Sequence, residues 1–384
     1  MTQTFETLVF PYLNHAVRMF ESGYATAVDI DNAMRFGCGY PKGPLTVLDE
    51  VGPAVVRDAL AARFAETGDH LHQPADLLDR IADEGGSFTA GGVGSAEAPR
   101  LQHEIARLGV VGTGTMASGI AQVFAQCGYD VVVVGRGEDK LARVTAYVTK
   151  NLDRAIERGK SDEATKAEVL GRLSVTTSRA DLADVDLVVE AIAEDIAVKR
   201  DLFRDLDEIL KPGAILATTT SSLPVTELAK ATSRSADVIG MHFFNPAPVM
   251  KLVEVVTTEL TAPAVDETVR ALTAKVGKVA VSCGDRAGFI VNALLFPYLN
   301  DAVRLAASGA DLTAIDADIK EAAGFPMGPF ELLDVVGNDV SLAIQEELFR
   351  EFGEPGFAPA ATLVAKVAAG ELGRKTKKGF HDYS

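Results

Sequence analysis

The sequence has little of what several classes of protein require. Its three cysteines, Cys38, Cys127 and Cys283, are far apart and odd in number, so they predict neither a disulfide framework nor a metal site. The net charge is −17 with no basic face, which argues against a nucleic-acid partner. No run of about 18 apolar residues is present, so no membrane-spanning helix is expected. The N-terminus lacks the basic segment and cleavage site of a secretory signal, and a cytoplasmic protein is expected.

What the 384 residues do contain is an internal repeat. "LVFPYLNHAVRMFESG" (8–23) recurs as "LLFPYLNDAVRLAASG" (294–309), and "GYPKGPLTVLDEVG" (39–52) recurs as "GFPMGPFELLDVVG" (324–337). Two blocks in the same order and at nearly the same spacing indicate a duplicated domain, although two copies are too few for a solenoid. Apolar residues recur at intervals of three and four in each copy, which predicts amphipathic helices.

Between the two copies the pattern changes twice. The Gly-rich stretch "EGGSFTAGGVGSAEAP" (84–99) is typical of a flexible linker. From about residue 104, apolar strand-like segments alternate with helical ones, which predicts a parallel sheet wrapped by helices. We therefore expect a helical copy at 1–83, a linker at 84–103, an α/β domain at 104–284 and an all-α copy at 285–384.

The segment "GVVGTGTMASGIA" (109–121) follows a predicted strand and opens a predicted helix. Gly112 fits a tight turn, Gly114 lets the backbone approach a pyrophosphate, and Ala117 permits close packing of the helix, whose N-terminus binds phosphates. This context predicts a Rossmann-type dinucleotide-binding domain, and the alternative is a glycine turn without a cofactor. The expected contacts are Gly112, Gly114, Thr115, Met116 and Ala117.

The end of the second predicted strand bears on which dinucleotide binds. An acidic residue normally stands there and holds the ribose 2′-hydroxyl of NAD, but Gly135 occupies the position and Arg136 follows. Without the carboxylate a 2′-phosphate meets no like charge, and Arg136 can pair with it. This favours NADP over NAD, with Glu138 and Asp139 as the alternative ribose contacts.

Four polar residues stand out from their apolar surroundings. "VIGMHFFNPAPVMKLVEVV" (238–256) brings His242 and Glu254 from two predicted strands on either side of a Pro-rich turn. Ser221 comes at the C-terminal end of another predicted strand, where ligands bind in α/β sheets. Asn292 lies among apolar residues of a predicted helix and needs hydrogen-bond partners. The structural alternatives are a core histidine, a helix-capping serine and an asparagine that bonds between helices.

Five segments together resemble the 3-hydroxyacyl-CoA dehydrogenase family, which includes the 3-hydroxybutyryl-CoA dehydrogenases. They are "GVVGTGTMASGIAQVFAQCGYDVVVV", "DLVVEAIAEDIAVK", "TTSSLPVTELA", "GMHFFNPAPVMKLVEVV" and "AGFIVNALLFPYLN". The resemblance runs from about residue 104 to residue 382. It implies an oxidoreductase of fatty-acid β-oxidation or short-chain acyl-CoA metabolism, which interconverts 3-hydroxyacyl-CoA and 3-oxoacyl-CoA with NAD(P).

The resemblance also assigns roles to particular residues. His242 would be the general acid/base for the substrate's 3-hydroxyl, and Glu254 would orient it and favour its charged form. Ser221 and Asn292 would hydrogen-bond the substrate. The further implied contacts are Glu194, Lys199, Asn245 and Lys375 to the cofactor and Asn151 and Arg158 to CoA.

The chain departs from the family pattern at three positions. Gly135 replaces the usual Asp, Ala117 replaces a third Gly, and Thr220 stands where an Asn commonly precedes Ser221. The first two changes concern the choice of cofactor. None of the three removes the catalytic set.

The N-terminal copy cannot repeat the site, because Glu6 aligns with Asn292 and no equivalent of the C-terminal "GRKTKKGF" is present. We therefore expect one active site per chain. The two copies would pack within the chain as a pseudo-dimer, or be exchanged in a homodimer, unless the chain is the later part of a longer duplicated enzyme. The competing functions are a dehydrogenase of a non-CoA hydroxy acid and a non-catalytic dinucleotide-binding protein.

Overall fold

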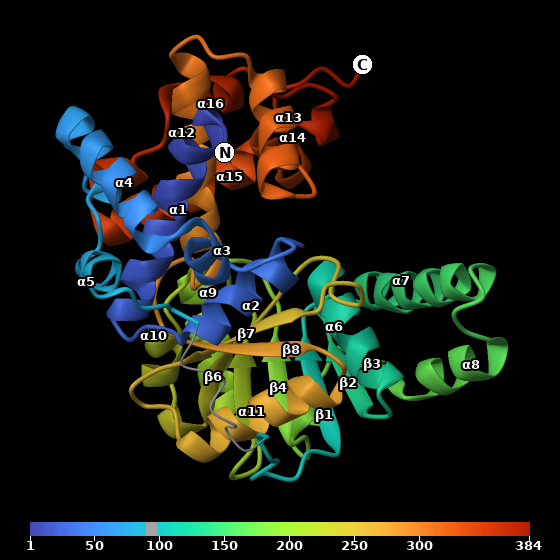
Figure 1. Ribbon diagram of the computed structural model, residues 1–384. Helices are drawn as coiled ribbons and strands as arrows, with labels where there is room; N and C mark the ends of the chain where they lie inside the picture. Colours follow the sequence, from blue (N-terminus) through green and yellow to red (C-terminus); the bar gives the residue numbers. More distant parts are fainter. Residues whose placement is uncertain (90–97) are drawn as a thin grey trace. The chain divides into compact units, whose positions relative to one another are not determined.

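The computed structural model describes residues 1–89 and 98–384 (Figure 1). Residues 90–97, within the predicted linker, lie outside the described residues. The chain forms two compact units, one of Glu97–Asp285 and one of Met1–Ala96 together with Arg286–Ser384. The predicted fold class is confirmed, because an α/β domain lies between two helical segments of the sequence that belong to one helical unit.

The α/β unit is built on an eight-stranded sheet in the order β3-β2-β1-β4-β5-β6-β7-β8. The first six strands in this order run parallel to one another, whereas β6 and β7 are antiparallel and β7 and β8 are parallel. The central strands are Val- and Ile-rich and buried, as expected for a sheet covered on both faces. The strands are β1 (Arg107–Val111), β2 (Asp130–Val134), β3 (Leu173–Thr176), β4 (Leu187–Glu190), β5 (Ile215–Thr218), β6 (Val238–Phe243), β7 (Leu252–Thr257) and β8 (Val279–Gly284).

Helices cover this sheet, with α6 packed on β1 and β2 and α11 packed on β6, β7 and β8. Two further helices, α7 and α8, run side by side as a hairpin at the β3 edge (Figure 1). The helices of the unit are α6 (Thr115–Gln126), α7 (Glu138–Glu157), α8 (Glu163–Gly171), α9 (Ile196–Ile209), α10 (Val225–Lys230) and α11 (Pro263–Lys275), with 3-10 turns η2 (Arg179–Leu182) and η3 (Ser235–Asp237).

The helical unit contains both sequence repeats, and the repeats pack against each other through α1 and α12. The N-terminal copy consists of α1 (Gln3–Glu21), α2 (Ala27–Gly37), α3 (Pro44–Val51), α4 (Pro53–Thr67), η1 (His70–His72) and α5 (Asp76–Glu84). The C-terminal copy consists of α12 (Val291–Ala307), α13 (Leu312–Ala323), α14 (Pro329–Val336), α15 (Asn338–Phe352), η4 (Pro355–Phe357), α16 (Ala361–Ala368) and η5 (Arg374–Thr376).

Equivalent asparagines make equivalent hydrogen bonds within each of the two copies. The Asn14 Oδ1 atom accepts a hydrogen bond from the Ala75 amide at 2.9 Å, and the Asn300 Oδ1 atom accepts one from the Ala360 amide at 2.8 Å. Each asparagine is buried, so its polar side-chain atoms need hydrogen-bond partners. The bond links the first α-helix of each copy to the start of its last α-helix. None of the helices in the described part of the chain combines the length and apolar character needed to cross a membrane.

Candidate active site

The turn between β1 and α6 has the geometry of a phosphate-binding loop. Gly112 has φ of 139°, and a Cβ there would overlap the Ala191 carbonyl oxygen, so only glycine fits. A Cβ at Gly114 would meet no atom within 4 Å among the described residues, which leaves room for a ligand. The first turn of α6, which contains Thr115 and Met116, has no side-chain cap, so its N–H groups can receive an anion.

Gly135, after β2, lies at a position where a side chain would overlap its neighbours. A Cβ at this position would overlap the Thr113 methyl group and lie 2.9 Å from Leu141 Cδ2. The space that an aspartate would need is therefore already filled. Arg136 follows with an exposed side chain.

His242 and Glu254 form a hydrogen-bonded pair. They are direct partners in the antiparallel register of β6 and β7, so their side chains leave the sheet on the same face. The His242 Nδ1 atom lies 2.6 Å from Glu254 Oε2. Glu254 has no exposed surface and His242 is 8% exposed. A carboxylate held against Nδ1 fixes the orientation and tautomer of the ring and stabilises the imidazolium when it forms.

The Pro-rich turn that joins β6 to β7 is held on two sides, and neither contact can be predicted from the sequence pattern. The Lys278 ammonium donates hydrogen bonds to the Ala247 and Met250 carbonyl oxygens at 2.6 and 2.7 Å. On the other side Gly119 of α6 lies against the turn, because a Cβ there would be 3.1 Å from Pro248 Cδ. The turn that carries Asn245, whose side chain is exposed, is therefore fixed to the helix of the dinucleotide site.

A second polar network lies at the C-terminal ends of β4 and β5. Glu194 Oε1 accepts from the Ser221 amide at 2.9 Å, and Glu194 Oε2 accepts from the Thr220 hydroxyl at 3.1 Å. The Lys199 ammonium lies 2.9 Å from both Glu190 carboxylate oxygens and 3.3 Å from Glu194. Lys199 has no exposed surface, so its contacts are with these carboxylates and not with solvent. The network orients Glu194 and Ser221 together.

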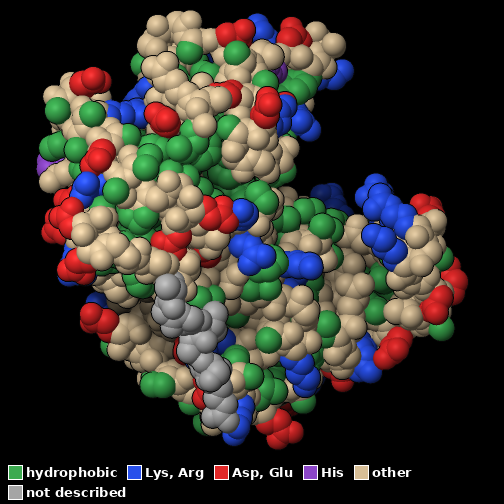
Figure 2. All heavy atoms as spheres, viewed as in Figure 1, with side chains coloured by type: hydrophobic (Ala, Val, Ile, Leu, Met, Phe, Trp, Pro, Cys, Tyr) green, Lys and Arg blue, Asp and Glu red, His purple; other side chains and the backbone are tan. Residues whose placement is uncertain are grey.

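The remaining predicted residues lie on other elements. Asn151 of α7 donates to Gln122 Oε1 of α6 at 3.0 Å, whereas Arg158 at the end of α7 is exposed. Lys and Arg side chains gather over α7 (Figure 2). Asn292, in the first turn of α12, is 9% exposed, and Lys375 pairs with Asp339 at 2.6 Å. These last two residues belong to the helical unit.

A parallel sheet with a glycine phosphate turn and a carboxylate-paired histidine in one unit is typical of dinucleotide-dependent dehydrogenases. The model of the "3-hydroxyacyl-CoA dehydrogenase, NAD binding domain" matches residues 107–286. The model of the "3-hydroxyacyl-CoA dehydrogenase, C-terminal domain" matches twice, at 5–97 and 288–383. The chain belongs to the 3-hydroxyacyl-CoA dehydrogenase family, a family of NAD-binding oxidoreductases, and carries its C-terminal domain in duplicate.

Individual relatives agree with this placement. The 3-hydroxybutyryl-CoA dehydrogenase of Clostridioides difficile is 47% identical over 279 residues, which are 72% of this chain and 99% of the relative. The crystal structure of (S)-3-hydroxybutyryl-CoA dehydrogenase from Ralstonia eutropha is 40% identical with a TM-score of 0.72, over 73% of this chain and all of that one. A diketoreductase that acts on dicarbonyl compounds is 30% identical with a TM-score of 0.64, over 73% of this chain and 99% of its own.

Proposed function

We propose that this chain interconverts 3-hydroxyacyl-CoA and 3-oxoacyl-CoA with NAD(P), in fatty-acid or short-chain acyl-CoA metabolism. The observation that carries the proposal is the His242–Glu254 hydrogen bond on adjacent strands of a family member. The named activity of the C. difficile and R. eutropha relatives supports a 3-hydroxybutyryl-CoA-like substrate.

The proposed chemistry moves one proton and one hydride. A bound nicotinamide cofactor would supply the acceptor for the hydride that leaves C3 of the hydroxyacyl group. His242 takes the hydroxyl proton on Nε2, because Nδ1 is engaged by Glu254. Glu254 then balances the charge of the imidazolium, and reduction of the 3-oxo group reverses both transfers.

Ser221 and Asn292 are proposed to hydrogen-bond the substrate, and Glu194 and Asn245 to contact the cofactor together with Lys375. For Lys199 we propose an indirect role. Because its ammonium is buried between Glu190 and Glu194, it would position Glu194 and would not touch the cofactor itself.

The preference for NADP over NAD is part of the proposal. The Thr113 methyl group fills the space that a ribose-binding aspartate would need, and the exposed Arg136 is available for a 2′-phosphate. The measurement is the reduction of acetoacetyl-CoA with NADH and with NADPH in parallel. Equal or better kcat/KM with NADH would contradict the preference.

CoA recognition is proposed to use the basic surface of α7, with Arg158 as a direct contact. Asn151 would support this surface through its bond to Gln122 of α6. The likeness to the diketoreductase favours a second candidate, a dicarbonyl or hydroxy-acid substrate without CoA. Comparison of acetoacetyl-CoA with ethyl acetoacetate separates the two, because a CoA enzyme should lose most of its kcat/KM with the ester.

We propose one such site in each chain. His242→Ala should reduce turnover about 10²- to 10⁴-fold, the usual contribution of a general acid/base. Wild-type turnover in this variant would refute the catalytic role of His242, whereas an absence of turnover in the wild type would favour a non-catalytic dinucleotide-binding protein.

A further inference from the structure

The two helical copies meet about an approximate two-fold axis. Tyr40 and Phe325 occupy equivalent positions of the repeat, and their rings stack at 3.6 Å with an interplanar angle of 3°. Tyr12 and Tyr298, also equivalent, have ring centroids 6.0 Å apart. Residues that meet their own counterparts define an isologous contact, which in principle also suits two identical copies from different chains.

On one side of this axis the contact is apolar. The His15 ring of the N-terminal copy lies edge-on to Phe357 of the C-terminal copy at 5.5 Å, and Phe352 stacks on Phe357 at 4.5 Å. Burial, together with the charges of Arg286 and Arg18, lowers the pKa of His15 to about 3. His15 is therefore neutral at ordinary pH, which suits its aromatic neighbours.

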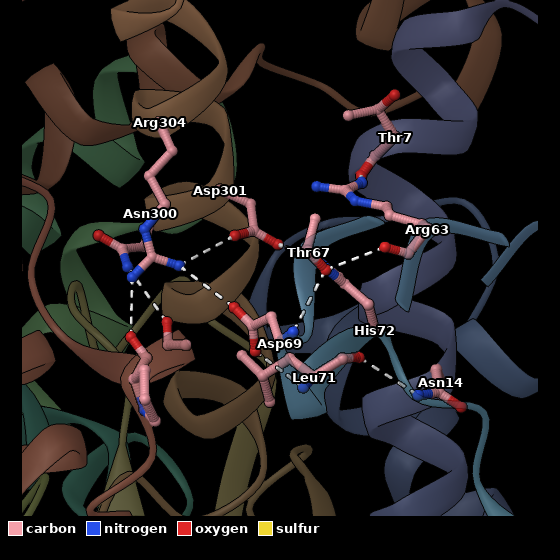
Figure 3. Close-up of polar contacts among 12 residues, drawn as sticks. Thr7, Asn14, Arg63, Thr67, Asp69, Leu71, His72, Asn300, Asp301 and Arg304 are labelled. Carbon is pink, nitrogen blue, oxygen red and sulfur yellow. Dashed lines mark hydrogen bonds and ion pairs between the residues drawn. The ribbon is translucent and has the colours of Figure 1, made fainter. Parts of the chain in front are cut away.

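On the other side the equivalent contact is polar. Asp301, which aligns with His15, points from α12 toward the N-terminal copy (Figure 3). Its Oδ2 atom lies 3.8 Å from His72 Nε2, and both side chains are about 5% exposed. The Thr67 hydroxyl lies 2.9 Å from His72 Nδ1. Arg304, on the same helix as Asp301, lies 3.5 Å from its Oδ1 atom.

The difference between the two sides is encoded at three aligned pairs of positions in the repeats. Arg63, Thr67 and His72 form a polar set in the N-terminal copy, which lines a cavity of about 470 Å³ together with Asp301. The aligned residues of the C-terminal copy, Leu348, Phe352 and Phe357, form an apolar set. Each set therefore matches the residue opposite it, the polar set facing Asp301 and the apolar set facing His15.

We propose that Asp301 and the two sets make the interface selective, so that the C-terminal copy accepts the N-terminal copy of its own chain and rejects a second C-terminal copy. Pairing of two C-terminal copies would place each Asp301 against Phe357 and Phe352. An aromatic ring offers no hydrogen-bond donor to a buried carboxylate, and Arg304 alone would remain as a partner. A mismatch of this kind disfavours the wrong pairing, which is how specific interfaces exclude competitors.

The first test is a double-substitution cycle in the full-length chain. His72→Phe leaves Asp301 opposite a ring, and Asp301→His places a second imidazole opposite His72. Each single change should lower the unfolding midpoint of the helical unit by at least about 5 °C, because removing one member of a buried polar pair leaves the other without its partner. The double variant copies the His15–Phe357 contact to the other side and should recover most of the loss. A loss equal to the sum of the two single losses would overturn the proposal.

The matched control is His70→Phe, because His70 belongs to the same 3-10 turn as His72 but is exposed. His70→Phe should change the midpoint little and should not rescue Asp301→His. If His70→Phe rescues Asp301→His as well as His72→Phe does, the effect is general hydrophobicity and the proposed pairing is wrong.

The second test measures mass by sedimentation velocity. Asp301→His makes the C-terminal copy self-complementary and weakens its pairing with the N-terminal copy. This variant should therefore form a dimer at about 100 µM, although the tethered copy has an effective concentration near 1 mM. The wild type and the double variant should remain at the 40.6 kDa of one chain. Equal masses for the wild type and Asp301→His would also overturn the selectivity.

Discussion

Glu254→Gln tests the proposed mechanism with the smallest change in shape. Glutamine fills the same fully buried site and can still bond to His242 Nδ1, but it removes the charge at the other end of the 2.6 Å contact. A hydrogen bond to a charged group contributes about 1.5–3 kcal/mol, and a neutral one about 1 kcal/mol. If the imidazolium forms in the transition state for oxidation, the variant replaces a charge-assisted hydrogen bond with a neutral one in that state.

The expected effect on turnover follows from these energies. The loss in the transition state is the difference between the two kinds of bond, about 0.5–2 kcal/mol, which corresponds to a roughly 2- to 30-fold lower kcat at about 1.36 kcal/mol for each factor of ten. KM for the acyl-CoA should change little, because Glu254 is buried behind the histidine and has no surface for the substrate. The assay is steady-state oxidation of a 3-hydroxyacyl-CoA, with thermal unfolding to establish that the variant is folded.

The control is Glu259→Gln, an exposed glutamate that follows β7 and removes the same charge from the same region. Wild-type kcat in Glu254→Gln, or an equal loss in the control variant, would refute the reasoning. A rise in KM with unchanged kcat would do so as well, since it would place Glu254 in substrate binding.

Three further substitutions probe other parts of the site. Gly135→Asp should lower kcat/KM with both cofactors, because the new Cβ would overlap the Thr113 methyl group. Adding Thr113→Ala should restore activity with NADH, and no recovery would refute the steric argument. Lys278→Met should raise KM for the cofactor more than it lowers kcat, since the turn at 245–250 loses two hydrogen bonds, and unchanged kinetics would count against this. Asn292→Ala should reduce turnover whereas Glu6→Ala should not, and equal losses would contradict a single site.

The sequence was sufficient wherever a feature depends on local pattern. The repeat, the strand–turn–helix around Gly112 and the alternation of strands and helices follow from spacing along the chain. The pairing of His242 with Glu254 also follows, because two strands joined by a short turn are antiparallel neighbours, and residues on one face then meet across the ladder.

Features that depend on residues far apart in the sequence could not be predicted. Lys278 lies 31 residues from Ala247, and a lysine before a strand is ordinarily taken as exposed. The Thr113 methyl group, after β1, fills the space that a Cβ at Gly135, after β2, would need. This overlap is visible only when the ends of the two strands are seen side by side. In each case the signal is a tertiary contact between elements that no periodicity links.

Comparison of the two copies with each other offers a signal that neither copy carries alone. Positions that build the common fold are alike in both, as with Asn14 and Asn300. At other aligned positions the polarity or charge of the residue is reversed although the fold is the same, as with His15 and Asp301 or His72 and Phe357. Folding does not explain these differences, because both residues fit the same backbone. Such reversed pairs are expected where each copy must recognise the other, and here they gather on the two sides of one axis. In a duplicated domain, internal differences of this kind therefore point to the pairing surface, much as internal identities point to the core.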